Sequence, residues 1–325
     1  MRERTLLVGS ITVVAAAVGF AMLGPLARFA YDAGMEPFSF VAWRAAFGTL
    51  IVAIYAALRI SRGRRFVAPW RLPGRQGWFL ALAALTAITL NVASFIAFGR
   101  TTIALVLLGF YTYPAFVAAV AVARGDERLD AIRATALVVS LAGMVLVVAG
   151  GLDPSGPVRA DALGIALALV AALSQTVFVT ISRHGYSSMP TDQAMGWMLG
   201  ATMVSSAAIA LGTGAAAQLV LPLTSGQALA IAAVAGLFGA GIPSLLFLTG
   251  IRTIGGTRTG ILMLFEPLVG VLLAALLLDE RLQPIQAVGG AAILGAALLL
   301  QRSAADVEPA PAMRAGPGVV PGAER

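Results

Sequence analysis

The sequence predicts an all-α membrane protein of ten transmembrane helices, arranged as two inverted repeats of five helices. Three observations lead to this fold class. The composition is too apolar for a water-soluble domain, and apolar segments of membrane-spanning length recur along the whole chain. A motif from the first half also returns in the second half at a fixed offset.

The composition excludes an ordinary soluble domain. Hydrophobic residues make up 59% of the 325 residues, charged residues 11%, and the mean hydropathy is +0.91. A soluble domain carries about 25% charged residues, so this chain lacks the polar groups to cover a water-exposed surface. The chain has no cysteine and one histidine, His184, and it shows no clustered acids or nucleophile. We therefore expect no enzyme, no metal and no cofactor.

Charges and Gly/Pro clusters divide the chain into ten apolar segments. A helix needs about 20 apolar residues to cross ~30 Å of hydrocarbon. The linkers are short except Arg59–Gly77 and the polar, uncharged stretch Gly212–Gly226. The first segment is too long for the apolar core of a signal peptide, so we expect it to stay as a span. The ten predicted spans are Leu6–Ala27, Phe38–Leu58, Trp78–Phe98, Thr101–Ala123, Ala131–Val148, Ala162–Ser182, Asp192–Leu211, Gln227–Leu248, Thr259–Leu278 and Ile285–Leu300.

The distribution of arginine predicts the orientation. All 22 basic residues are arginine, and alternate linkers divide them into 17 on the side of the N-terminus and 4 on the other, with Arg44 inside a span. Cytoplasmic loops carry the excess of positive charge. We therefore expect the protein to lie in the inner (plasma) membrane of the cell, with both termini in the cytoplasm. The net charge of +7 then reflects loop bias, and no nucleic-acid partner is expected.

A repeated motif relates the two halves. Residues 1–150 form the predicted first repeat, 151–302 the second, and 303–325 a disordered cytoplasmic tail rich in Ala, Pro and Gly. Because each repeat holds five spans, an odd number, the two enter the membrane in opposite senses. The matching positions, at offsets of 152 to 154 residues, are Trp43 with Trp197, Pro114 with Pro267, Asp126-Glu127-Arg128-Leu129 with Asp279-Glu280-Arg281-Leu282, and Gly143 with Gly295.

These motifs resemble those of the EamA-like family of drug/metabolite transporters. The similarity covers about residues 6–301. It implies a ten-helix fold with a central cavity shared by the two halves, and transport of small metabolites such as amino acids or drugs. Where the second half has Glu266-Pro267, the first half has Tyr113-Pro114, so a symmetric pair of acids is not expected. The stretches that carry the resemblance are Trp43-Arg44, Pro114, Gly125-Asp126-Glu127-Arg128-Leu129, Gly250-Ile251-Arg252, Leu264-Phe265-Glu266-Pro267, Leu278-Asp279-Glu280-Arg281-Leu282 and Gly295.

Glu266 is the first candidate for a coupling group. It is the one acid of fifteen placed well inside a predicted span, roughly 10 Å from the cytoplasmic end at 1.5 Å per residue. An intramembrane acid costs about 2.5–3.5 kcal/mol, and protonating a glutamate at pH 7 costs about 3.7 kcal/mol. These costs are too close to decide its charge. Glu266 either couples proton or substrate movement or bonds to backbone freed by Pro267.

Arg44 is the second candidate, about six residues from the outer end of its span. It either holds a substrate carboxylate or extends its guanidinium outwards to water, since its depth is only ~9 Å. At that depth a direct pair with Glu266 is not expected.

The remaining candidates are polar or aromatic side chains inside apolar sequence. Asn91 and Gln175 either line the cavity or bond between helices. The aromatic rings of Tyr111, Tyr113, Trp43 and Trp197 lie away from the usual interfacial belt, which favours a cavity lining. Candidate helix breaks are Pro25, Pro114, Pro243 and Pro267, which membranes tolerate where protein or a cavity covers the backbone.

The sequence therefore predicts a secondary transporter of small metabolites, with amino acids and export favoured, working by alternating access. The alternative is a channel-like facilitator or a lipid or drug flippase on the same fold. The expected partners are a small-molecule substrate and the lipid bilayer. The sequence neither requires nor excludes a homodimer.

Overall fold

The computed structural model describes residues 2–126, 130–151, 160–278 and 283–305, and all regular structure in these ranges is helical. Within these ranges, nine helical segments are long and apolar enough to cross a membrane, and a shorter apolar helix covers Pro284–Leu300; we count it as the tenth crossing. The predicted fold class is confirmed. The motif residues 127–129 and 279–282, and the tail from residue 306, lie outside the described residues.

The first half contains five crossings, two of which are interrupted. Carboxylates cap two of the helix starts: Glu36 accepts the Ser39 N–H at 2.9 Å, and Asp130 accepts the Arg133 N–H at 2.8 Å. A short 3-10 helix at Pro69–Arg71 interrupts the linker before the third crossing. The crossings are α1 (Arg2–Ala21) with α2 (Leu23–Asp32), α3 (Pro37–Ser61), α4 (Gly74–Arg100), α5 (Ile103–Phe110) with α6 (Tyr113–Ala123), and α7 (Ala131–Gly150).

The second half also contains five crossings and one additional helix. The eighth crossing includes a π-helical segment, η2, between two α-helices. The elements are α8 (Ala162–Ser182), α9 (Thr191–Gly212), the connecting α10 (Ala216–Thr224), α11 (Gly226–Val234) with η2 (Ala235–Gly241) and α12 (Ile242–Ile254), α13 (Gly256–Met263) with α14 (Phe265–Leu278), and α15 (Pro284–Ala305).

Two predicted boundaries were wrong for identifiable reasons. The stretch Gly212–Gly226 is not only a linker, because α10 forms within it; Leu221 on this helix packs against a cluster that contains Phe40 and Ala228. The ninth crossing begins at Gly256 and not at Thr259, since Gly255 adopts φ +85° and lets the chain reverse at once after α12.

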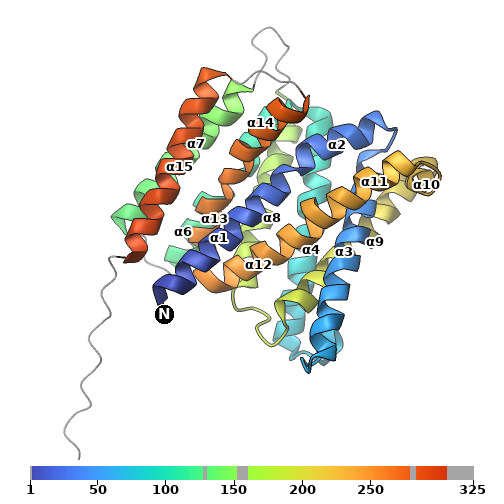
Figure 1. The fold of residues 1–325 in the computed structure, drawn as a ribbon, viewed down its shortest axis with the longest axis horizontal. Coiled ribbons are helices and arrows are strands. Elements are labelled where there is room, and N and C mark those ends of the chain that lie inside the picture. Colours follow the sequence, from blue (N-terminus) through green and yellow to red (C-terminus); the bar gives the residue numbers. More distant parts are fainter. Residues whose placement is uncertain (1, 127–129, 152–159, 279–282, 306–325) are drawn as a thin grey trace, which may run out of the picture.

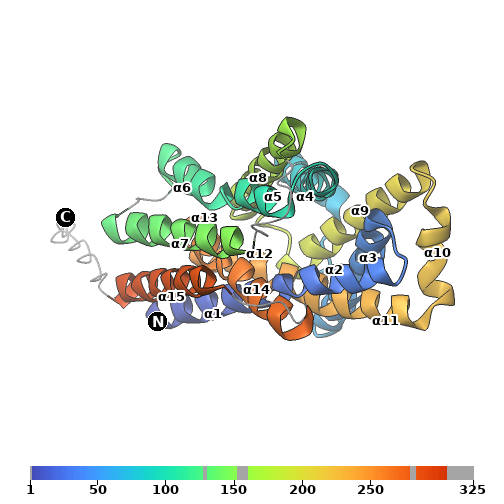
Figure 2. The ribbon, with the colours of Figure 1, turned by 90° about the horizontal axis from the view of Figure 1, so that it is seen from above.

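The helices pair across the two repeats. The most extensive contacts join α7 with α15, α3 with α9, α4 with α8, and α1 with α12, while α6 packs on α13. Each pair takes one helix from each half, as an approximate two-fold relation between inverted repeats requires. In Figure 1, the start of α1 and the end of α15 lie at the same end of the bundle, and Figure 2 shows α7 and α15 lying alongside each other.

Glycine allows the backbones of α7 and α15 to come close together. A Cβ atom added at Gly289 on α15 would lie 2.5 Å from the Gly143 carbonyl oxygen on α7. Small residues allow such backbone contact between membrane helices, where lipid gives no hydrophobic drive for association. Gly295, which the repeat pairs with Gly143 in sequence, has nothing within 4 Å of an added Cβ. The packing partner of Gly143 is therefore Gly289.

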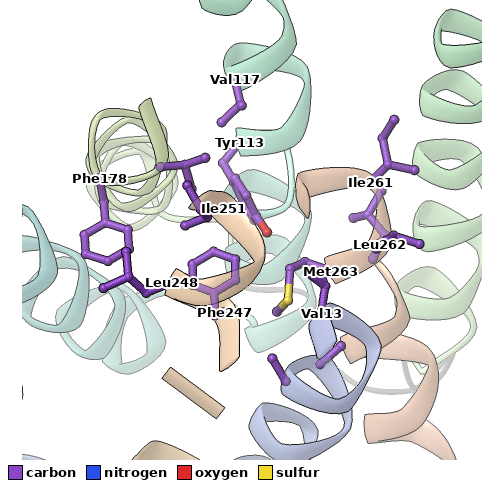
Figure 3. Packing of buried hydrophobic residues seen from close by; sticks show 14 of the residues in the cluster. Val13, Tyr113, Val117, Phe178, Phe247, Leu248, Ile251, Ile261, Leu262 and Met263 are labelled. Atoms are coloured by element: carbon purple, nitrogen blue, oxygen red, sulfur yellow. The ribbon is translucent and has the colours of Figure 1, made fainter. Parts of the chain in front are cut away.

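The largest buried cluster connects the two halves. Figure 3 shows part of it: Val13 of α1, Tyr113 of α6 and Phe178 of α8 converge on α12 and α13. Phe247 of α12 stacks on Phe178 with ring centroids 6.2 Å apart. This core holds in place the two interrupted crossings that form the candidate site.

Candidate functional site

The fourth and ninth crossings are interrupted at equivalent positions. In the fourth, α5 ends at Phe110 and α6 begins at Tyr113; in the ninth, α13 ends at Met263 and α14 begins at Phe265. Proline follows each interruption, as Pro114 and Pro267, within the first turn, where its missing N–H breaks no helical bond. Discontinuous helices at matching positions of two repeats are the usual location of a transporter binding site.

The two interruptions bring three candidate side chains together. Tyr111 and Tyr113 are 3% and 1% exposed. The Tyr111 phenol lies within hydrogen-bonding reach of the Glu266 carboxyl, and Tyr113 lies within electrostatic range of the same group. Phe110 packs on both tyrosines, with ring centroids 5.1 Å and 5.3 Å apart. We call Tyr111, Tyr113 and Glu266 the mid-span cluster.

Glu266 lies deeper than the sequence suggested. Because the helical crossing starts at Gly256, Glu266 is ten residues from its end, or about 15 Å at 1.5 Å per residue. It sits in the first turn of α14, where the helix dipole favours a negative charge. It also retains some accessible surface, in contrast to the buried tyrosines. The Tyr111 phenol therefore gives the carboxyl a defined partner at this depth.

Arg44 and Asn91 form a second polar pair. The Arg44 Nη2 donates to the Asn91 Oδ1 at 2.8 Å, and the Asn91 Nδ2 donates to the Ala87 carbonyl at 2.8 Å. Tyr31 is within electrostatic range of the guanidinium. Arg44 makes no hydrogen bond or ion pair to Glu266 among those described.

The two tryptophans do not join either group. The Trp43 indole N–H donates to the Leu219 carbonyl on α10 at 2.7 Å, which uses its polar atom in a contact between helices. Trp197 is 44% exposed and packs edge-to-face on Trp70 with centroids 6.2 Å apart. Although the repeat matches Trp43 with Trp197 in sequence, the two side chains lie in separate contacts.

The other candidates occupy separate positions. Gln175 is partly buried on α8. Pro25 follows the interruption between α1 and α2, and Pro243 is the second residue of α12, directly after η2.

A π-helical segment inside a helix is often found at functional sites. Here it brings Gly236 against the Arg44 carbonyl, which an added Cβ would approach to 2.7 Å.

Arg252 organises the end of the bundle that carries the N-terminus, a role the sequence did not reveal. Its guanidinium donates to the Met189 carbonyl at 2.9 Å and to the Ser182 carbonyl at 3.3 Å. It also lies over the Tyr186 ring, 5.0 Å from the centroid. Burial raises the pKa of Tyr186 to about 12, so its hydroxyl stays neutral. The motif Gly250-Ile251-Arg252 drew attention to this arginine in the sequence, but the sequence did not indicate which residues Arg252 contacts.

In the part of the chain that the structure describes, no three His, Cys, Asp or Glu side chains gather to hold a metal ion. What the site offers is a carboxyl with two phenols at mid-span and a guanidinium nearer one end. Such groups can bind a small polar solute inside a membrane-spanning helical bundle.

The fold and this site define a polytopic membrane transporter. The family model of the EamA-like transporter family matches residues 7–149 and 162–302. The chain belongs to the EamA-like transporter family.

Two individual proteins show similarity over nearly the full length. An uncharacterized transporter of Archaeoglobus fulgidus is 27% identical over 297 residues, which cover 90% of this chain and 96% of that protein. A solved crystal structure superposes with a TM-score of 0.75 at 20% identity, over 92% of this chain and 98% of the other. That second likeness supports the fold alone.

Proposed function

We propose that this transporter is a secondary carrier of small metabolites, with amino acids and related compounds as the substrate class and export as the direction. The observation that carries the proposal is the mid-span cluster. Two helices from opposite repeats are interrupted at equivalent depth and face each other there. In alternating access, the two repeats would swap conformations around this cluster, so that it opens first to one side of the membrane and then to the other.

Glu266 is the proposed coupling group. A carboxyl in the middle of a crossing is expensive and usually faces a cavity or proton path. The Tyr111 phenol gives the carboxyl a defined partner, and Glu266 is less buried than the two tyrosines. Proton binding in one access state and release in the other would link solute movement to a pH gradient.

The orientation and assembly of the carrier are part of the proposal. The arginine-rich linkers lie on the side of the N-terminus, so we place both termini in the cytoplasm and the protein in the inner membrane. We assign it no enzymatic activity. The mass of the detergent-solubilised protein, measured by light scattering, would test whether two copies associate.

The test is uptake of radiolabelled amino acids, nucleobases and drugs into proteoliposomes, with and without a pH gradient. We expect gradient-dependent flux in the wild type and its loss in Glu266→Gln. The matched control is Asp32→Asn, which removes an exposed carboxyl at the end of α2 and should leave flux unchanged. Flux that ignores the gradient and survives Glu266→Gln would refute coupling and favour a channel-like facilitator or flippase.

A further inference from the structure

Arg44 has unused hydrogen-bonding capacity inside the membrane. A guanidinium carries five N–H donors. One Nη2 donor bonds to Asn91, while the Nε donor is buried and has no partner. Seven residues separate Arg44 from the start of α3 at Pro37, a depth of about 10 Å. A buried charge is normally paired, so this arrangement is incomplete without an anion.

Two arginines on α12 and α13 differ in this respect. Arg252 donates to several backbone carbonyls, and Arg258 donates to the Leu300 carbonyl at 2.8 Å. The partner of Arg44 is a neutral amide, and in the described part of the chain no carboxylate forms an ion pair with it. Asn91 fixes the direction of the guanidinium without neutralising it.

Two side-chain contacts join α3 and α4 in the region of Arg44. The helix α3 packs mainly on α9 and η2, and α4 packs mainly on α8, so long side chains bridge α3 and α4. One bridge is the Arg44–Asn91 hydrogen bond; the other is the contact of the Phe38 and Phe95 rings, with centroids 5.9 Å apart. Phe95 lies one helical turn from Asn91. An apolar group beside a carboxylate would therefore find aromatic neighbours.

We propose that Arg44 is the anion-binding residue of the substrate site and that the solute carries a single carboxylate. A guanidinium matches a carboxylate through two parallel N–H···O bonds. With one cation at this place, a singly charged group balances the site, whereas a doubly charged phosphate would need a second cation. The inference rests on the proposed transport function, and it names the residue that binds the solute and the chemical group that this residue recognises.

The experiment compares acids with their neutral amides. Purified full-length protein is titrated with acetate, benzoate, 4-methylpentanoate and L-leucine, and with the amide of each, and binding is followed by the thermal unfolding midpoint. We expect at least one acid to bind the wild type about tenfold to a hundredfold more tightly than its amide. Arg44→Gln should remove that preference, and Arg44→Lys should keep part of it because the charge remains.

The control is Arg62→Gln, which removes an exposed guanidinium just beyond the other end of α3 and should bind like the wild type. Equal binding of acids and amides by the wild type, or a preference that persists in Arg44→Gln, would overturn the inference. Proteoliposome flux with the same compounds separates the two proposals. Equal flux of acids and amides refutes the carboxylate site alone, whereas Arg44-dependent binding without any flux refutes the transport proposal alone.

Discussion

The crossing of α7 and α15 allows a quantitative test of the packing between repeats. Replacing Gly289 by alanine adds one methyl group where the backbones of α7 and α15 come close together. Its Cβ would lie 2.5 Å from the Gly143 carbonyl oxygen, 2.9 Å from the Leu146 Cβ and 2.9 Å from the Val147 nitrogen. Two of these three atoms belong to the backbone of α7, so no side-chain rotation relieves the contact.

The expected cost follows from the distances. The two helices must separate by several tenths of an ångström, and a gap of about 0.5–1 Å already loses a quarter to a half of the attraction between the atoms that flank it. Overpacking of this kind costs about 1–3 kcal/mol. We expect the free energy of unfolding of Gly289→Ala to lie below that of the control Gly295→Ala by that amount, measured by SDS titration in mixed micelles with circular dichroism.

The same helix provides the control. Gly295 is exposed, and an added Cβ there meets nothing within 4 Å. Both substitutions gain the same helix propensity, about 0.5–1 kcal/mol for alanine over glycine. The difference between the two variants therefore isolates the contact with α7. Equal stability of Gly289→Ala and Gly295→Ala would show that the two helices do not approach this closely.

Two further substitutions test polar contacts. Burial raises the pKa of Tyr186 from 10.0 to about 12. The neutral phenol therefore makes its full contribution to the free energy of unfolding below pH 10, and this contribution is lost as the pH rises towards 12. The unfolding free energy should fall by up to roughly 3 kcal/mol over this range in the wild type and less in Tyr186→Phe; parallel curves would contradict this. Trp43→Phe should leave the Leu219 carbonyl without its donor at 2.7 Å, cost about 1–3 kcal/mol and speed hydrogen exchange in α10. Trp197→Phe, at a side chain 44% exposed, should not change that exchange, and equal rates in both variants would refute the assignment.

The sequence by itself determined the class of protein and its repeat. Hydropathy is a local property, so a run of apolar residues predicts a crossing whatever its neighbours are. An offset of 153 residues between Pro114 and Pro267 likewise needs no structure to be seen. Boundaries were less certain, and the late predicted start of the ninth crossing placed Glu266 about 5 Å too close to one end.

Only the tertiary structure decided which side chains meet. Each helix can rotate about its own axis and cross its neighbours at several angles without changing its hydropathy. The sequence could not show that Arg44 bonds to Asn91, or that Glu266 lies against Tyr111. Nor could it show that Trp197 packs on Trp70, apart from Trp43. These pairings depend on long-range packing between the two repeats, because contacts such as that of Gly143 with Gly289 fix how each helix is turned.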